Sequence, residues 1–240
     1  MDMSYPSVTR LGTKGEFMGH SRFAVYYIAP EGELARFGAQ WLGWDVIAGA
    51  AADPLPIAGR DDVTMTPRKY GFHGTLKPPF RLAEGTDPDG LKAAVSGLAA
   101  RLPAARCDGL GLTRLGRFLA LTPLGETEAL SHLAASCVTD LDDFRAPASP
   151  EELAKRRGAG LSPAQEANLV AWGYPYVRDQ FRFHLTLTGR LPKPDLPHWE
   201  AVLQAALPPL PAPFVINSLG LVGERPDGRF ELIHRYALTG

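Results

Sequence analysis

Two kinds of apolar pattern recur along the chain. Short runs rich in aromatic and β-branched residues stop at a proline, as in "RFAVYYIAP" (residues 22–30) and "LGRFLALTP" (residues 115–123), and such runs are typical of β-strands. Each run is followed by a stretch with apolar residues at helical spacing, namely "GELARFGAQWLGWDV" (32–46) and "ETEALSHLAASCVTDLDDF" (126–144). The pattern therefore predicts a strand and then a helix at two places.

A second strand and a second helix are predicted after each of these pairs. The strands are "YGFHGTL" (70–76) and "FRFHLTLTG" (181–189), and the helices are "DPDGLKAAVSGLAARL" (87–102) and "DLPHWEAVLQAAL" (195–207). The order strand, helix, His-containing strand, helix thus occurs twice. It predicts an α+β fold in which two duplicated βαβα-type halves, with antiparallel sheets, lie around a central cleft and are related by a pseudo-twofold axis.

Proline and glycine mark the expected breaks between these elements. The segment with Pro54 and Gly59 is expected to be a loop, and the first His-containing strand is expected to end at Pro78 and Pro79. Near the end of the chain, "FVINSLGLVGERPDGRFELIHRYAL" (214–238) contains two strand-like runs joined by Pro-Asp-Gly. This arrangement predicts a closing β-hairpin.

The domain organisation follows from these elements. We expect a single bilobal domain over residues 22–240, with halves of about 22–104 and 105–240. Residues 1–21 are polar and contain glycine but no apolar core, which predicts a poorly ordered leader rather than a signal peptide. Extra chain of about 145–173 in the second half has no counterpart in the first half.

This insert carries two helix starts of the same type. Ser149 and Ser162 each precede a proline, and Glu152 and Gln165 stand three residues after the serines, which is the pattern of a capping box. Gly173 is expected to end the second helix. The insert is therefore predicted to be a short helical hairpin, either a structural addition or a lid or wall beside a substrate.

The motif Phe-His-x-Thr-Leu occurs in both His-containing strands. Because side chains alternate between the two faces of a strand, His73 and Thr75 are expected on one face, and Lys77 continues the same parity. His184 and Thr186 share a face of the second strand in the same way. Since the apolar residues between them form the core face, the polar sets are expected to face a common cleft.

Two imidazoles and two hydroxyls in one cleft suit phosphodiester chemistry. A neutral imidazole can take a proton from water while a protonated one gives a proton to the leaving oxygen, and the ordinary histidine pKa of ~6.5 predicts a bell-shaped pH dependence about neutrality. The hydroxyls of Thr75 and Thr186 can donate to phosphate oxygens. No metal is expected, because two His and two Thr are a poor ligand set, and Cys107 and Cys137 form no zinc-type cluster. No cofactor is expected either.

Composition limits the partners. The 240 residues carry a formal net charge of −1, whereas a protein that binds long nucleic acid usually carries a basic excess. We therefore expect a small anionic phosphate ester as substrate and no long nucleic acid. No apolar stretch is long enough for a membrane span, and a cytoplasmic protein is the default expectation. The oligomeric state is left open.

On these residues the sequence resembles the 2H phosphoesterase superfamily, which carries one His-x-(Thr/Ser)-apolar motif in each half. The resemblance extends over about residues 23–238, and the strings "RKYGFHGTLKPPF" and "WGYPYVRDQFRFHLTLTG" are similar to a bacterial, DUF1045-like branch encoded among phosphonate-utilisation genes. It departs from many members of the superfamily, which have a basic residue where this chain has Gly189. The resemblance implies His73 and His184 as metal-independent acid and base on a cyclic phosphate, in this branch a phosphorylated ribose 1,2-cyclic phosphate.

Further residues beside the motifs are candidates for binding the substrate. A second phosphate on the substrate would need a cation, which favours Lys77 and Arg68 first. The full set of candidates is Lys77, Arg68, Tyr70, Tyr26, Tyr176 and Arg182.

Two other functions remain open at this level. One is an RNA-end 2′,3′-cyclic phosphodiesterase or 2′-5′ RNA ligase-like enzyme, against which the near-neutral charge counts. The other is a non-catalytic nucleotide-binding module, against which the two intact motifs count.

Overall fold

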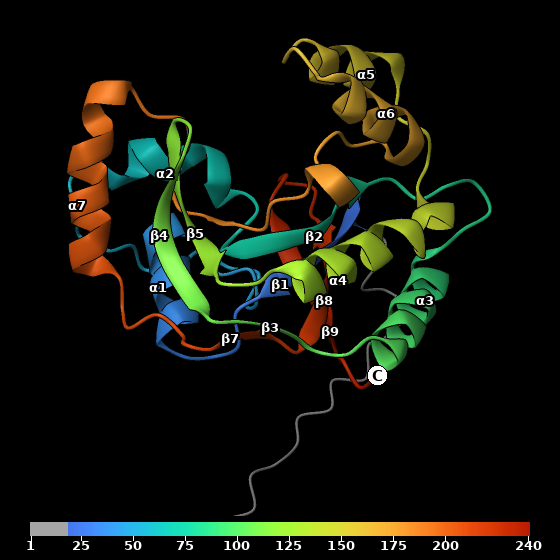
Figure 1. The fold of residues 1–240 in the computed structure, drawn as a ribbon, viewed down its shortest axis with the longest axis horizontal. Coiled ribbons are helices and arrows are strands. Elements are labelled where there is room, and N and C mark those ends of the chain that lie inside the picture. The colour runs from blue at the N-terminus through green and yellow to red at the C-terminus, as the bar shows by residue number, and fades with distance from the viewer. Residues whose placement is uncertain (1–18) are drawn as a thin grey trace, which may run out of the picture.

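The computed structural model describes residues 19–240. Its main sheet is antiparallel throughout, which confirms the predicted α+β class (Figure 1). In spatial order the strands are β4 (Gly109–Leu115), β5 (Phe118–Leu124), β6 (Leu185–Thr186), β2 (His73–Phe80), β1 (Phe23–Ile28), β8 (Ser218–Glu224) and β9 (Phe230–Ala237). Two short strands, β3 (Ala105–Cys107) and β7 (Phe214–Ile216), pair separately.

The helices of the described part are, in chain order, α1 (Glu33–Leu42), α2 (Arg60–Arg68), α3 (Pro88–Arg101), α4 (Glu128–Thr139), α5 (Pro150–Arg157), α6 (Pro163–Trp172) and α7 (Leu196–Ala206), with short 3₁₀ turns η1 (Asp142–Phe144), η2 (Arg178–Gln180) and η3 (Lys193–Asp195). Four of them, α1, α3, α4 and α7, pack on one face of the sheet. The apolar residues of α1, α3, α4 and α7 share one core with Val25 and Tyr27 of β1. Tyr26, between them, belongs to a smaller cluster on the other face.

The duplicated order predicted from the sequence is present. The first half runs β1, α1, β2, α3 and the second runs β5, α4, β6, α7, with α2 and the α5–α6 pair added between helix and His-strand. Each opening strand pairs with the His-strand of its own half, and the two His-strands, β2 and β6, pair with each other at the centre of the sheet. The two halves therefore meet at the two motifs.

The closing hairpin forms as predicted, with its turn closed by a hydrogen bond from the Arg225 amide to the Arg229 carbonyl at 2.8 Å. Its first strand, β8, pairs with β1, so strands from both sides of the sequence division near residue 105 lie together. Of the predicted leader, residues 1–18 lie outside the described part. Ser21 is tied to the sheet, because its amide donates to the Glu224 carbonyl at 3.0 Å.

Strand lengths differ from the expectation in both motifs. β2 does not end at Pro78 and Pro79 but continues to Phe80; both prolines lie where the β1–β2 register is irregular and past the single β2–β6 pair, so no regular ladder bond needs their missing N–H groups. The second His-strand is a two-residue strand, Leu185–Thr186, rather than the whole of 181–189.

One helix, α2, and two strands, β4 and the short β3, were not predicted from the sequence pattern. α2 occupies part of the expected loop, and it lacks an apolar stripe because its buried residues are Arg60, Thr64 and Pro67. Arg60 is held by the carbonyls at the end of α1, including that of Trp41. β4 precedes β5 as the other arm of a hairpin, where only β5 had been expected.

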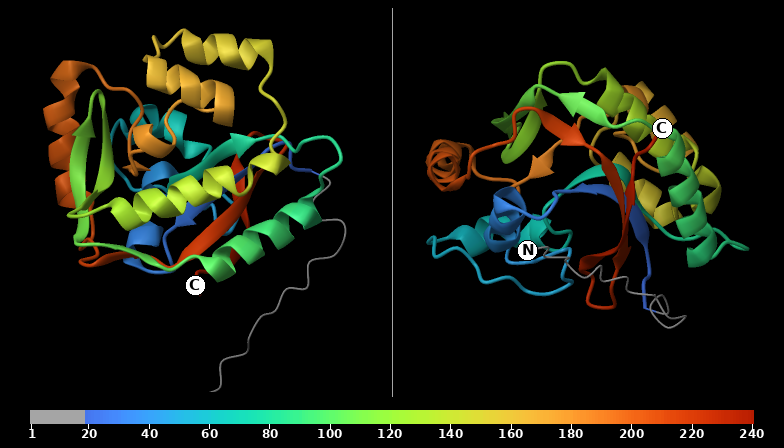
Figure 2. Two further views of the ribbon diagram at one scale, coloured as in Figure 1. Left: turned by 45° about the vertical axis from the view of Figure 1, so that its right-hand side comes forward. Right: turned by 90° about the horizontal axis from the view of Figure 1, so that it is seen from below.

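The insert has the predicted form. Ser149 and Ser162 both cap their helices with complete capping boxes, and Gly173 ends α6 in the left-handed conformation. No residue of α5 is buried, and α6 buries only Asn168 and Leu169. In Figures 1 and 2 the hairpin accordingly stands out from the body of the molecule.

Candidate active site

The two motifs are aligned by a single backbone pairing. Gly74 of β2 lies opposite Leu185 of β6 in antiparallel register, so the flanking positions oppose each other in turn. All four flanking side chains lie on the face opposite the helix-covered core, because Gly74 and Leu185 face that core. The resulting cross-strand pairs are His73 with Thr186 and Thr75 with His184.

This register sets the separation of the histidines. His73 and His184 are diagonal neighbours on one face, a relation that places Cα atoms about 7–8 Å apart in a sheet. The two imidazoles also interact electrostatically, since His184 contributes to lowering the pKa of His73. Thr75 links the two, since its Oγ1 lies 3.2 Å from His73 Nε2 and its strand position is opposite His184.

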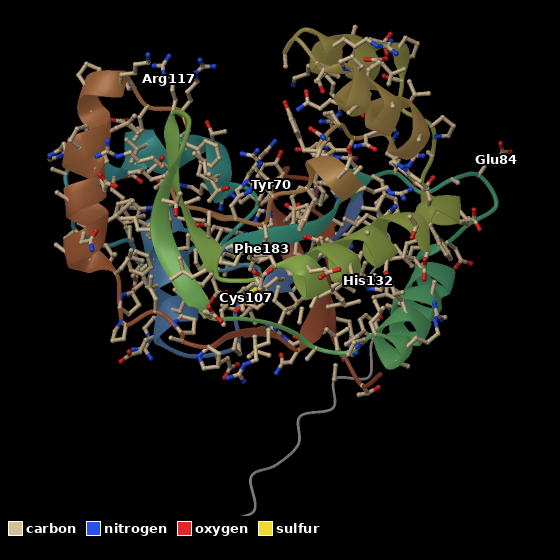
Figure 3. All side chains as sticks on the ribbon, in the orientation of Figure 1. Tyr70, Glu84, Cys107, Arg117, His132 and Phe183 are labelled. Atoms are coloured by element: carbon tan, nitrogen blue, oxygen red, sulfur yellow. The ribbon has the colours of Figure 1, made fainter. Side chains whose placement is uncertain are left out.

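Glycine at position 74 is required by packing across the motifs. A Cβ atom there would overlap the ring of Phe183, the residue before His184. Phe183 is buried in the core, and Figure 3 shows it at the centre of the molecule, away from peripheral residues such as Glu84 and Arg117. The close approach of Phe183 to Gly74 thus holds the second motif against the first.

Both imidazoles are oriented in the same way. His73 Nδ1 lies 2.9 Å from the carbonyl oxygen of Gly71, and His184 Nδ1 lies 2.8 Å from that of Arg182. A carbonyl oxygen only accepts, so in both rings Nδ1 carries the proton and donates it. In each ring this leaves Nε2 for other interactions. In His73 it lies 3.2 Å from Thr75 Oγ1.

The surroundings of His73 keep its ring neutral. Tyr26 stacks on it with ring centroids 3.9 Å apart, and Tyr70 lies 6.0 Å away. Burial, which disfavours the imidazolium, lowers the pKa of His73 to about 4; the bond to the Gly71 carbonyl opposes this shift and His184 adds to it. With Nδ1–H donating, Nε2 of the neutral ring is the nitrogen that can accept a proton or a hydrogen bond.

His184 lies on the wall of an open pocket. Its neighbouring ring is Phe118, 5.6 Å away and tilted. Burial lowers its pKa too, opposed by the bond to the Arg182 carbonyl. The two histidines therefore share a local geometry but not an environment.

The pocket that contains Thr75 and His184 has a volume of about 680 Å³, within the range of small-ligand sites. It lies between the β4–β5 hairpin and the α5–α6 insert. The residues around it are Thr75, Leu76 and Pro78 of β2; Arg114, Leu115, Gly116 and Phe118 of the hairpin; Gln165, Tyr174 and Tyr176 of the insert and the chain after it; and Val177, Asp179, Gln180, Phe181, Arg182 and His184.

The prediction that Lys77 lies on the same strand face as His73 and Thr75 is wrong. A β-bulge inserts Leu76 between the pairs Val25–Lys77 and Tyr26–Thr75, so Lys77 lies on the core face rather than on the face of Thr75. It is buried, and its Nζ donates to the Val138 carbonyl of α4 at 2.9 Å.

The ammonium group of Lys77 interacts with groups of the protein itself and not with the pocket. Its Nζ lies 3.4 Å from Asp142, and burial lowers its pKa to about 8 although Asp142 opposes the shift. Thr188, at the equivalent position of the second motif, is also buried and accepts from the Leu119 amide at 3.0 Å. In both motifs, the residue two positions after the threonine is therefore buried and stabilises the fold.

The guanidinium group of Arg68 is also hydrogen-bonded within the protein, away from the pocket. Its Nε donates to the Leu42 carbonyl at 2.8 Å, and its Nη2 donates to Thr64 Oγ1 at 3.0 Å and to Asp61. These bonds tie the end of α2 to the end of α1. Arg68 is not among the residues that line the pocket.

The other predicted residues lie near the histidines. Tyr26 and Tyr70 flank His73, while Tyr176 and Arg182 line the pocket on the side of His184. Burial raises the pKa of Tyr26 well above its usual value, so its hydroxyl stays protonated. Figure 3 shows Tyr70 near the centre of the fold.

Several pocket residues were not predicted. The sequence pattern places Phe118 only in a strand, and Tyr174, Gln165 and Arg114 come from segments whose position beside the site depends on the fold. Tyr174 carries a partial signal, since it belongs to the "YPY" of the string before the second motif. Arg156 of α5 lies over its ring at 4.4 Å.

Within residues 19–240 no three His, Cys, Asp or Glu side chains gather in a way that could hold a metal ion. Both cysteines are buried thiols. No helix in the described part of the chain has the length and apolarity needed to cross a bilayer.

Comparison with known proteins places these features in context. The chain is 38% identical over 181 residues to "Ribose 1,5-bisphosphate phosphokinase PhnN" of Janthinobacterium sp. (strain Marseille), covering 73% of this chain and 40% of that protein. It is 36% identical over 188 residues to the protein of the same name from Laribacter hongkongensis (strain HLHK9), covering 75% of this chain and 43% of that protein. The chain thus spans less than half the length of these relatives.

Two solved structures with a similar course of the chain are "Crystal structure of phosphoesterase" and "Crystal structure of E.coli LigT complexed with ATP". Each has 16% sequence identity and a TM-score of 0.41, and each match covers 92% of this chain and 99% of the other. Residues 75–231 match the family described as "Protein of unknown function (DUF1045)". The match covers more than half of the sequence and includes the second motif, and the chain belongs to the DUF1045 family.

Proposed function

We propose that this chain is a metal-independent phosphodiesterase that hydrolyses a small cyclic phosphate, with His73 and His184 as its acid–base pair. The observation that carries the proposal is the register of Gly74 with Leu185. This register puts the two histidines and the two threonines on one face of the sheet, which supports the binding of one phosphate group between them.

The environments support separate roles for the two histidines. His73, with a pKa lowered to about 4, is the general base: its Nε2 takes a proton from water as the water oxygen bonds to phosphorus. His184 is the general acid. Its Nε2–H gives a proton to the leaving ester oxygen of the cyclic phosphate as the bond between phosphorus and that oxygen breaks. Thr75 and Thr186 donate to the non-bridging oxygens. Each acid or base contributes about 10²–10⁴-fold.

The relatives suggest the substrate. Proteins named for a kinase of ribose 1,5-bisphosphate contain a region similar to this chain. Opening a 1,2-cyclic phosphate on ribose 5-phosphate at the bond to O2 yields ribose 1,5-bisphosphate. We therefore propose ribose 5-phosphate 1,2-cyclic phosphate as the substrate, in keeping with the resemblance to proteins of phosphonate utilisation.

The test is a substrate panel with EDTA present. The panel contains ribose 5-phosphate 1,2-cyclic phosphate, 2′,3′-cyclic nucleotides, and RNA ending in a 2′,3′-cyclic phosphate. We expect turnover of the sugar phosphate, with ribose 1,5-bisphosphate identified by ³¹P NMR. Activity lost in EDTA and restored by a divalent ion would overturn metal independence. A clear preference for RNA ends would establish the RNA-processing alternative, and no turnover of any cyclic phosphate would overturn the proposal.

A further inference from the structure

We propose that Arg182 is the residue by which the pocket recognises a second phosphate group on the substrate, and that it makes the site selective for bisphosphorylated sugars. This inference rests on the proposed function, because it assigns the substrate's other end. Arg182 thereby takes the role that the sequence suggested for Lys77 and Arg68.

The backbone of Arg182 is fixed by the acid–base pair itself. Its carbonyl oxygen accepts from His184 Nδ1 at 2.8 Å, so any movement of Arg182 would disturb the ring. Its side chain is exposed and lines the same 680 Å³ pocket as His184. A ligand held at His184 therefore extends into the space that this guanidinium borders.

The charge of Arg182 is not balanced by a neighbouring acid. Two arginines line the pocket, and Arg114 is held by Glu200 of α7, with Nε donating at 2.8 Å. Arg182 makes no ion pair with any residue of the part of the chain described. An unpaired guanidinium at a concave surface attracts anions and presents paired N–H donors that match phosphate oxygens.

Asp179, an acidic residue that also lines the pocket, does not neutralise the charge of Arg182. Asp179 accepts from Asn168 Nδ2 and from Gln180 Nε2, each at 3.0 Å, and these bonds lower its pKa. Both carboxylate oxygens are thus bonded to side-chain amides. The insert supplies Asn168, so α6 helps to keep this carboxylate engaged while Arg182 faces the pocket.

The distance along the chain matches the size of a pentose phosphate. Arg182 and His184 are two residues apart, and an extended chain spans about 6.4–6.8 Å over two residues. A phosphate on C5 of a ribose whose 1,2-cyclic phosphate lies between the histidines is separated from it by the sugar ring, a span of that order. The other cationic candidates, Lys77 and Arg68, are bonded to α4 and to the end of α1 instead.

The experiment compares two substrates that differ only in the second phosphate: ribose 5-phosphate 1,2-cyclic phosphate and ribose 1,2-cyclic phosphate. For ribose 5-phosphate 1,2-cyclic phosphate, we expect Arg182→Gln to lower kcat/KM about tenfold to a hundredfold, the loss expected when a charge-assisted hydrogen bond is removed. For ribose 1,2-cyclic phosphate, we expect kcat/KM to change little. Arg182→Lys keeps the charge without the paired donors and should retain part of the preference. Arg106→Gln, an exposed arginine on β3, is the matched control.

The outcomes separate the two proposals. A wild-type enzyme that opens both substrates equally well, or an Arg182→Gln variant that loses the same factor on both, overturns the role of Arg182 and leaves the phosphodiesterase intact. A wild-type protein that opens no cyclic phosphate overturns the proposed function, and the inference with it.

Discussion

His73 and His184 hold the same position in the two motifs, yet His73 lies against a stacked tyrosine and His184 lies on the wall of an open pocket. Their local geometry is duplicated down to the Nδ1 bond with the carbonyl two residues earlier. What differs comes from other elements: β1 supplies Tyr26 for the first ring, and β5 supplies Phe118 for the second. A duplicated motif thus acquires two environments through its neighbours, and the separate roles proposed for the two rings rest on that difference.

The supporting strands differ as well. β2 runs for eight residues and contains a bulge that turns Lys77 into the core, whereas β6 is only two residues long. The second histidine depends on tertiary contacts for its position, among them Phe183 over Gly74. The difference teaches that one long strand carries the first motif, and that a short segment of the other half pairs with it to bring in the second motif.

The largest effects are expected from removing the imidazoles. If the roles differ as proposed, His73→Ala and His184→Ala each lower kcat/KM by at least ~10²-fold. His73→Ala should abolish the acidic limb of the pH profile and His184→Ala the alkaline limb. The measurement is kcat/KM against pH for each variant, and near-normal turnover by either one would remove the acid–base pair from the mechanism.

Changing Gly74 should break the docking of the two motifs. Gly74→Ala forces the Phe183 ring away and shifts His184 relative to His73, and a displacement of about 1 Å can cost 10²-fold in rate. Adding Phe183→Leu should restore part of the activity, because a smaller side chain leaves room for the methyl group.

Gly97→Ala serves as the control for this change, since in α3 a Cβ atom at position 97 has only the end of Arg101 within 4 Å. Equal losses in Gly74→Ala and Gly97→Ala would contradict the packing argument. Thermal unfolding of all variants separates a shifted site from a destabilised fold.

The pH optimum should lie below neutrality in the free enzyme. His73 must be neutral and its pKa is about 4, so activity falls only as pH drops toward that value. His184 must be protonated and its pKa lies below the ordinary 6.5, so activity falls as pH rises past it. The profile of kcat/KM should therefore peak between these limits rather than about pH 7, with apparent pKa values that belong to the coupled pair.

The substitution Tyr26→Leu tests whether the stacked tyrosine accounts for the lowered pKa of His73. Removing the stacked ring exposes His73 to water, which should raise its pKa toward the ordinary value and move the acidic limb to higher pH. Phe118→Leu should move the acidic limb less, because Phe118 neighbours the other histidine. ¹⁵N NMR titration of the two imidazoles checks the assignment directly, and a limb that stays in place in Tyr26→Leu would refute the shielding role of Tyr26.

The smallest effect is expected from Lys77. Lys77→Met keeps the apolar length of the side chain in the core, and Asp142 retains its bonds to Arg145 at 2.7 and 2.9 Å. We expect kcat/KM within about threefold of wild type, since the side chain lies on the face away from the histidines. A loss as large as that of a histidine variant would return Lys77 to the substrate site.

The sequence by itself determined most of the strands and helices and the repeat of the His-x-Thr motif. Aromatic and β-branched runs gave most of the strands, helical spacing gave most of the helices, and the repeat singled out His73, Thr75, His184 and Thr186 as one set. The helix starts at Ser149 and Ser162 were equally accessible. All of these depend on residues close together in the chain, and local propensity and capping are set by such neighbours.

Only the tertiary structure decided which further side chains share the site. Strand parity placed Lys77 beside Thr75, but the bulge at Leu76 reversed its face, and pairing with β1 is what reveals a bulge. α2 has no apolar stripe because its buried residues include Arg60, held by carbonyls of another helix. Arg182 and Arg68 are both arginines before a motif, yet one has its charge unpaired in the pocket and the other is bonded to α1 and Asp61. Such differences arise from partners distant in sequence, which a local pattern does not contain.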